Sequence, residues 1–277
     1  MTQSPPSRSQ PTRAEIGVIG GSGLYAFLED ATEVPVSTPY GDPSDPLVVG
    51  TVAGRQVAFV PRHGRDHQHP PHRINYRANL WALRSLGVRQ VLAPCAVGSL
   101  HADLGPGSLV VPDQLVDRTS GRVQNFYDLG AVHVSFADPY CPDGRKVVLQ
   151  TARAAGWPPV DSGTMVVVEG PRFSTRAESR WYAEQGWTLV NMTGHPEAIL
   201  ARELGLCYTS IALVTDLDAG VAQGEGVTQA EVFAIFARHV ERLRELLYAA
   251  VPALPVERSC PCTSALDGLP LPFELPE

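Results

Sequence analysis

The chain has 277 residues, enough for one large α/β domain or two small ones and for a substantial core. Its 22 Lys and Arg against 29 Asp and Glu give a formal net charge of −7 without basic runs, which argues against nucleic acid as a partner. No apolar run reaches the roughly 18 to 20 residues that span a bilayer, and no signal-peptide apolar region is present. We therefore expect a cytoplasmic protein with no membrane partner.

Apolar runs of the length of buried strands alternate along the chain with helical patterns. The predicted strands cover residues 16–19, 56–60, 88–96, 108–115, 164–169 and 208–215. Helices are predicted at 75–86, 146–155 and 196–203 and after two possible capping boxes, Thr175 with Glu178 and Thr228 with Glu231. This alternation predicts a single-domain α/β fold, with a sheet flanked by helices and right-handed crossovers.

We expect three segments in the chain. Residues 1–13 form a disordered polar tail, residues 14–250 the α/β domain, and residues 251–277 an irregular, proline-rich C-terminal tail that packs on the domain or on a neighbouring subunit. No internal repeat or break in composition indicates a second domain.

A glycine turn, Gly20-Gly21-Ser22-Gly23, follows the first strand. Its spacing is not the Gly-x-Gly-x-x-Gly of dinucleotide sites, and no acidic residue closes a second strand about twenty residues later. A turn with backbone N–H groups and one hydroxyl suits a single phosphate. Alone, the turn is as readily a structural one.

A polar loop that begins with Arg62-His63-Gly64-Arg65 follows the second strand. An arginine fork and an imidazole donor can bind phosphate oxygens, whereas the alternative is a solvated loop. A metal site is disfavoured, because no carboxylate or cysteine partners accompany the four histidines of this region, His63, His67, His69 and His72.

Polar and small residues also end the later strands. Cys95-Ala96-Val97-Gly98-Ser99 would let a ligand approach backbone amides, although Cys95 could equally be a small buried apolar residue. Thr193 adds a hydroxyl near a helix start. Asp216 and Asp218 end the strand after that, where open α/β sheets bind ligands; the alternative is an exposed polar turn. These groups form one site only if the strand ends are neighbours.

Five cysteines are present, and an odd number argues against a disulfide scaffold. Cys260-Pro261-Cys262 lies in the tail, where two surface thiols and a labile, redox-sensitive disulfide are both open. A metal site there would need two more ligands nearby, and none is apparent, so no metal is expected.

Several of these motifs occur together in one known family. The chain resembles the purine nucleoside phosphorylases in Thr38-Pro39-Tyr40-Gly41, Arg62-His63-Gly64-Arg65, Asn75-Tyr76-Arg77-Ala78-Asn79, Val168-Glu169-Gly170-Pro171-Arg172-Phe173 and Asn191-Met192-Thr193. Asp117-Arg118-Thr119 and Thr215-Asp216-Leu217-Asp218 resemble the 5′-methylthioadenosine phosphorylase branch in particular. The motifs keep the family's order from about residue 16 to residue 247.

The resemblance implies a mixed sheet and a set of site residues. Phosphate, a co-substrate, would be held by Ser22, Arg62, His63, Cys95, Ala96 and Thr193. The purine nucleoside would contact Phe173, Ser174, Met192, Asp216, Leu217, Asp218 and Val232, with His133 supplied by a neighbouring subunit. A homo-oligomer follows, with a trimer favoured, and neither a metal nor an organic cofactor is implied.

The implied reaction is the phosphorolysis of 5′-methylthioadenosine to adenine and 5-methylthioribose 1-phosphate, with Asp216 as the acid near N7. Two aspartates favour a 6-aminopurine, because a carboxylate accepts from the N6 amine and repels a 6-oxo group. The apolar segment 227–236 contains no histidine and suits a methylthio group.

Two departures keep alternatives open. Cys95 stands where the branch usually has threonine, and Gly194-His195 resembles bacterial relatives of which some use 6-oxopurines. The alternatives are a 6-oxopurine nucleoside or 5′-methylthioinosine phosphorylase, a nucleosidase that uses water, and a non-enzymatic nucleotide-binding module.

Overall fold

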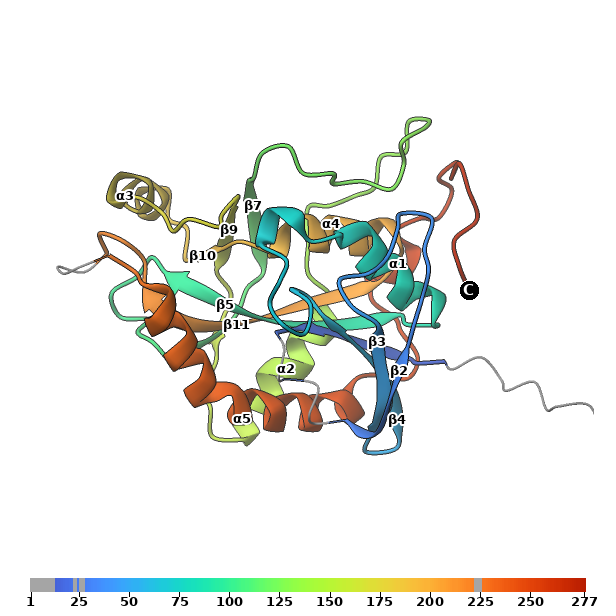
Figure 1. Cartoon of the computed structure of the whole chain (residues 1–277), viewed down its shortest axis with the longest axis horizontal. Coiled ribbons are helices and arrows are strands. Elements are labelled where there is room, and N and C mark those ends of the chain that lie inside the picture. Colours follow the sequence, from blue (N-terminus) through green and yellow to red (C-terminus); the bar gives the residue numbers. More distant parts are fainter. Residues whose placement is uncertain (1–12, 22–23, 25–27, 222–225) are drawn as a thin grey trace, which may run out of the picture.

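A computed structural model of the chain describes residues 13–21, 24, 28–221 and 226–277 (Figure 1). Its strands are β1 Ile16–Gly20, β2 Glu29–Val34, β3 Leu47–Val52, β4 Arg55–Pro61, β5 Gln90–Ser99, β6 Leu109–Val111, β7 Gln114–Arg118, β8 Val160–Asp161, β9 Thr164–Val168, β10 Leu189–Asn191 and β11 Cys207–Leu217. Its helices are α1 Tyr76–Ser85, α2 Pro142–Ala154, α3 Arg176–Glu184, α4 Gly194–Glu203 and α5 Gln229–Ala253, with short 3₁₀ turns η2 Pro71–Arg73 and η3 Pro261–Ser264.

The strands form one mixed sheet in the order β2-β3-β4-β1-β5-β10-β9-β7, and β11 pairs with β5 and β6 beside this path. Strand β1 is parallel to β4 and β5, and β11 is parallel to β5, whereas β10 runs antiparallel to β5. The prediction of an α/β fold with a mixed sheet flanked by helices is therefore confirmed.

Helices cover both faces of the central strands (Figure 1). Helices α1 and α4 pack on one face, around buried residues such as Leu80 and Leu200. Helices α2 and α5 pack on the other, around Val148 and Leu247. None of the helices in the described part of the chain is long and apolar enough to cross a membrane.

Local sequence signals located several elements well and misplaced others. Both capping boxes form, at Thr175 of α3 and Thr228 of α5. The single strand predicted over 108–115 is wrong: it is two strands, β6 and β7, separated by Pro112, which has no N–H for a ladder. The hairpin of β2 and β3 was not predicted, because β2 is a polar, exposed edge strand.

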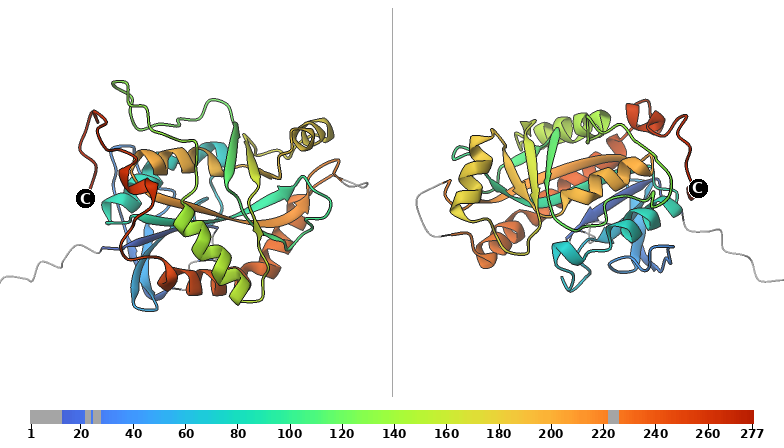
Figure 2. Two further views of the ribbon diagram at one scale, coloured as in Figure 1. Left: turned by 180° about the vertical axis from the view of Figure 1, so that it is seen from behind. Right: turned by 90° about the horizontal axis from the view of Figure 1, so that it is seen from above.

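The C-terminal segment, red in Figure 2, lies against the domain. The ring of Phe273 packs with its centroid 5.6 Å from those of Trp81 and Tyr127. Arg84 of helix α1 donates a hydrogen bond to the carbonyl oxygen of Pro276.

Strand β5 organises the centre of the sheet. Its first residues pair with β1, its whole length pairs with β11, and its last two residues pair with β10. The C-terminal ends of β5 and β11 therefore lie side by side, next to β10. This is where parallel sheets bind ligands, and the polar strand ends meet here.

Candidate active site

A cavity of about 690 Å³ opens at these strand ends, between the sheet, helix α5 and the loop after β4. Its wall contains most of the residues predicted for the site: Arg62, His63, Cys95, Ala96, Phe173, Ser174, Met192, Thr193, Asp216, Asp218 and Val232. The strand ends are therefore neighbours, which was the condition that the sequence could not test.

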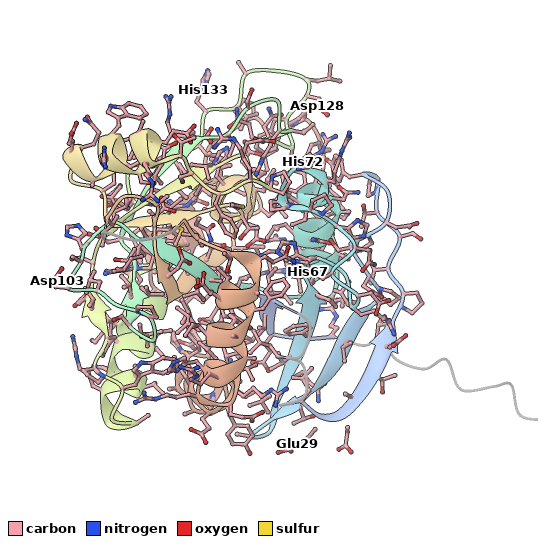
Figure 3. All side chains as sticks on the ribbon, turned by 60° about the vertical axis from the view of Figure 1, so that its left-hand side comes forward. Glu29, His67, His72, Asp103, Asp128 and His133 are labelled. Carbon is pink, nitrogen blue, oxygen red and sulfur yellow. The ribbon has the colours of Figure 1, made fainter. Side chains whose placement is uncertain are left out.

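Three predicted residues are not found among the described residues of this wall. Ser22 lies outside the described residues, although its neighbour Gly21 lines the cavity. Leu217, which the resemblance implied as a substrate contact, is absent from the wall within the described part of the chain, while Asp216 and Asp218 on either side line it. Successive strand residues point to opposite sides, which explains the exclusion of Leu217. His133 is exposed on the loop after β7 (Figure 3), and it is not among the residues that line the cavity of its own chain.

Arg62 is the central cation of one side of the cavity, and it is only 3% exposed. Its Nε and Nη2 form a two-point ion pair with Glu197 at 2.5 and 3.1 Å, and Nη1 and Nη2 donate to the carbonyl oxygens of Pro94 and Ile19. Four of the five N–H donors of the guanidinium are thereby used. The fork predicted for phosphate oxygens is thus largely committed to Glu197 and to two carbonyl oxygens, and one N–H remains.

Glu197 was not identified from the sequence as a site residue, although it is 1% exposed and also accepts a hydrogen bond from the Tyr208 hydroxyl at 2.8 Å. This ion pair joins α4 to the end of β4, and its two residues are 135 positions apart in the chain. No signal in the sequence indicates this pair, because the two buried charges come together only in the folded structure.

His63 lies beside Arg62 with its Nδ1 2.9 Å from the carbonyl oxygen of His69. A carbonyl only accepts, so Nδ1 carries the proton. Burial lowers the pKa of His63 to about 4, so the ring is neutral at pH 7. Its Nε2 is then an acceptor, and the expected donation to phosphate requires the ring to gain a proton.

Asn191 fixes the Thr193 segment on the same side. Its Oδ1 accepts from the backbone N–H groups of Thr193 and Gly194 at 2.8 and 2.6 Å, and its Nδ2 donates to the Ala96 carbonyl at 3.0 Å. One side chain thus joins the ends of β10 and β5 and orients the start of α4. Asn191 occurred in the sequence motif, but no role followed from it.

The aspartate side of the cavity is formed by Asp216 and Asp218 at the end of β11. Burial is the main cause that raises the pKa of Asp216 to about 6; a hydrogen bond from Thr215 opposes the shift, and the nearby Asp218 adds to it. Burial also raises the pKa of Asp218, which is 3% exposed and accepts a 2.6 Å hydrogen bond from Ser179. These aspartates do not form an exposed polar turn.

A register shift between Val214 and Asp216 aims the end of β11 at the cavity. Thr215 and Asp216, next to this bulge, both line the wall. Asp216 pairs with Gly98 of β5, and a Cβ atom on Gly98 would lie 3.0 Å from the Asp216 Oδ2. Gly98 therefore leaves the space that the carboxylate occupies.

The third side of the cavity consists of the first turns of helix α5, with Val232, Phe233 and Phe236. Helix α5 divides along its length: these residues line the cavity, whereas its buried core residues begin at Leu243. His67, labelled in Figure 3, also belongs to this side. The centroid of its ring is 5.6 Å from that of Phe233. Segment 227–236 contains no histidine, but the loop after β4 supplies one.

His195, one of the departures from the family pattern, does not line the cavity in the described structure. It is buried, with Nε2 2.7 Å from the side-chain oxygen of Gln124 and 3.3 Å from the carboxylate of Asp117. Its contacts hold the loop after β7 against α4.

Comparison with known proteins agrees with this geometry. The family model described as the Phosphorylase superfamily matches residues 15–252, and the chain belongs to this superfamily.

Similarity to individual proteins is high over nearly the whole length. The chain is 63% identical over 275 residues to a purine nucleoside phosphorylase of Streptomyces coelicolor, covering 95% of this chain and 98% of that protein. It is 62% identical over 263 residues to an S-methyl-5′-thioadenosine phosphorylase of Mycolicibacterium smegmatis, covering 94% and 99%. The structure of a methylthioadenosine phosphorylase from an antarctic soil metagenomic library superposes with a TM-score of 0.88 at 39% identity, covering 93% of this chain and 92% of that one.

Proposed function

We propose that this protein is a nucleoside phosphorylase that cleaves 5′-methylthioadenosine with inorganic phosphate to adenine and 5-methylthioribose 1-phosphate. The observation that carries the proposal is the pair of aspartates, Asp218 buried and Asp216 half-buried, facing a cavity whose other side holds a buried arginine and the Thr193 segment. Strands β1 and β5 lie between the strands that carry Arg62 and Asp216, and three strand steps of about 4.8 Å give roughly 14 Å between their backbones. A nucleoside and a phosphate fit between them.

The reaction needs an anion on one side of the sugar and an acid on the other. The C1′–N9 bond breaks and its electron pair goes to the purine, while a phosphate oxygen forms the new bond to C1′. Phosphate would lie by the remaining Arg62 N–H, the Thr193 hydroxyl and the backbone of Cys95 and Ala96. His63 Nε2 would accept the hydrogen of monohydrogen phosphate.

Asp216 would give its proton to N7 of the departing base. A pKa of about 6 in the free protein lies close to neutral pH, where a general acid is most effective. Asp218, held by Ser179, would accept from the N6 amine. Phe173 and Met192 would pack on the purine and the ribose, and the α5 side would enclose the methylthio group.

A specific observation favours a second candidate, the phosphorolysis of nucleosides with a 5′-hydroxyl. His67 stands among the apolar residues of the α5 side and can hydrogen-bond a hydroxyl. The relative that is 63% identical is named a purine nucleoside phosphorylase. The two candidates share their reaction and differ only in the 5′ and 6 substituents.

We further propose that the active form is a homo-oligomer, with a trimer favoured. His133 is exposed in a single chain, on a loop that extends from the domain (Figure 3). In an oligomer it would reach the α5 side of a neighbouring subunit. Phosphate is a co-substrate in this scheme, and no step requires an organic cofactor.

The deciding experiment is turnover of 5′-methylthioadenosine with and without phosphate, with the products separated by chromatography. We expect adenine and the sugar phosphate only when phosphate is present. Adenine release at the same rate without phosphate would identify a nucleosidase and overturn the proposal. Parallel assays with adenosine, inosine and 5′-methylthioinosine rank the substituents, and faster cleavage of the 6-oxopurines would favour the alternative specificity.

A further inference from the structure

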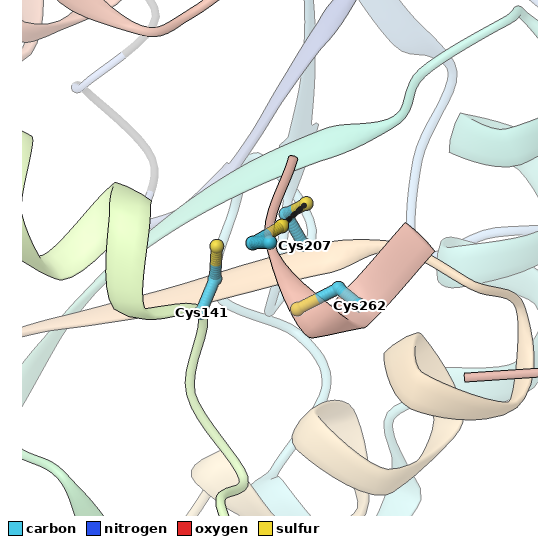
Figure 4. Close-up of side chains that lie close together, drawn as sticks. Cys141, Cys207 and Cys262 are labelled. Carbon is cyan, nitrogen blue, oxygen red and sulfur yellow. Dashed lines mark hydrogen bonds between the residues drawn. The ribbon is translucent and has the colours of Figure 1, made fainter. Parts of the chain in front are cut away.

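Four of the five cysteines lie together near the start of β11, at the opposite end of this strand from the cavity. Three of them are labelled in Figure 4. Cys141 caps the N-terminus of α2, Cys207 begins β11, and Cys260 and Cys262 belong to the turn η3 of the C-terminal segment. All four are buried, and they form a cluster composed of cysteines alone. The interpretation of Cys260 and Cys262 as surface thiols is therefore wrong, as is the expectation that no further ligands lie nearby.

The four sulfur atoms have the spacing of a metal site. All lie within 4.8 Å of one another, and the Sγ atoms of Cys207 and Cys260 are 3.3 Å apart. Zn–S bonds of about 2.3 Å place the sulfurs of a tetrahedral site roughly 3.8 Å apart, inside this range. A disulfide needs about 2.05 Å. Among the described residues, this is the one group of three or more His, Cys, Asp or Glu side chains that converges in this way.

The surroundings are suited to negative charge on the sulfurs. The backbone N–H of Gly144 donates to the Sγ of Cys141 at 3.5 Å, within the first turn of the 13-residue helix α2, whose N-terminus favours anions. Arg258 donates from Nη1 to the Sγ of Cys207 at 3.7 Å. Such N–H contacts orient thiolate ligands and offset the charge that they bring into the interior.

We propose that Cys141, Cys207, Cys260 and Cys262 form a closed structural site for a soft divalent metal ion, with zinc the expected occupant. Binding would release the four thiol protons to solvent and leave a tetrathiolate complex with two net negative charges. No ligand position remains for water, so the ion would have no part in catalysis. It would join the C-terminal segment to α2 and β11.

The fifth cysteine provides a matched control. Cys95 is buried as well, but its Sγ lies 3.7 Å from the hydroxyl of Ser210, in the wall of the cavity and outside the cluster. Replacing it removes a buried thiol from the chain without touching the proposed ligands. Cys95→Ser and Cys262→Ser each remove one buried thiol, but only Cys262→Ser removes a proposed metal ligand.

The test is elemental analysis of the full-length protein, expressed with zinc in the medium and purified under reducing conditions without chelator. We expect close to one zinc ion per chain in the wild type and in Cys95→Ser, and loss of most of the zinc in Cys262→Ser. With cobalt(II) in place of zinc, the visible absorption bands of a tetrahedral thiolate site should appear in the wild type and in Cys95→Ser, and not in Cys262→Ser.

Two results would overturn the site. One is wild-type protein without metal whose intact mass is lower by two hydrogen atoms for each disulfide formed within the cluster. The other is wild-type protein without metal and with all thiols free. Because these readouts use the wild type, they decide the matter even if Cys262→Ser fails to fold; the Cys95 control then shows that loss of one buried thiol is tolerated.

Discussion

Gly98 stands directly opposite Asp216 across the ladder of β5 and β11, and a methyl group on Gly98 would come within 3.0 Å of the Asp216 carboxylate. Asp216 has this position because of the bulge at the end of β11. The proposed acid is therefore aimed by a neighbouring strand as well as by its own.

Replacing Gly98 with alanine should displace the Asp216 carboxylate and lower kcat/KM for methylthioadenosine by about tenfold to a hundredfold, since small misplacements of catalytic groups are costly. Gly105→Ala is the control, because a Cβ there meets nothing within 4 Å. Both variants should keep the melting temperature of the wild type. Equal activity in the two variants would mean that the Gly98 contact does not set the geometry of the acid.

The protonation of Asp216 should appear in the pH dependence of kcat/KM. The protonated form is the active one and its pKa is about 6, so kcat/KM should fall about tenfold per pH unit above that value. Asp216→Asn should remove this limb and cost roughly a hundredfold to ten-thousandfold at pH 6. Exposed Asp103→Asn should keep the wild-type profile.

The ratio between substrates gives a second readout on the same variant. A neutral amide at position 216 should harm methylthioadenosine turnover more than inosine turnover, because the amide can donate to a 6-oxopurine. An unchanged ratio would show that Asp216 does not distinguish the bases.

Arg62 should be needed for stability as well as for phosphate. Arg62→Ala leaves Glu197 charged and buried, and breaking a buried ion pair in this way costs about 3 to 5 kcal/mol of unfolding free energy. This differs from the simple loss of a ligand contact that the sequence indicated. Denaturant unfolding measures it. Arg65→Ala is the control, because the Arg65 side chain is 46% exposed against 4% for Arg62, so its ion pairs with Asp45 and Glu33 should contribute far less.

The sequence could predict the site in outline because its groups lie at strand ends, and apolar runs followed by polar residues mark such ends. Arg62, Thr193 and Asp216 were located in this way. It could not reveal Glu197, Ser179 or the bulge, since these depend on contacts between segments far apart in the chain or on a local shift in register. The cysteine cluster escaped for the same reason: Cys141 and Cys207 are 66 residues apart, and only folding brings them to the tail.

Shared sites can be tested by mixing two impaired variants. If His133 acts in a neighbouring subunit, His133→Ala and Asp216→Asn chains that are unfolded and refolded together should form some sites with both native residues. Activity of the mixture should then exceed the sum of the separately refolded variants, and sedimentation should give a trimer. Purely additive activity, or an active monomer, would contradict the proposed role of His133.

The division of helix α5 has a further consequence. Its C-terminal half is fixed among core side chains such as Leu243 and Leu247, whereas its first turns present Val232 and Phe236 to the cavity. A substrate in the cavity would add packing contacts to these turns, beyond those that Phe236 makes with the core. The backbone amides of this one 25-residue helix should therefore exchange with solvent at graded rates, slow at one end and dependent on substrate at the other.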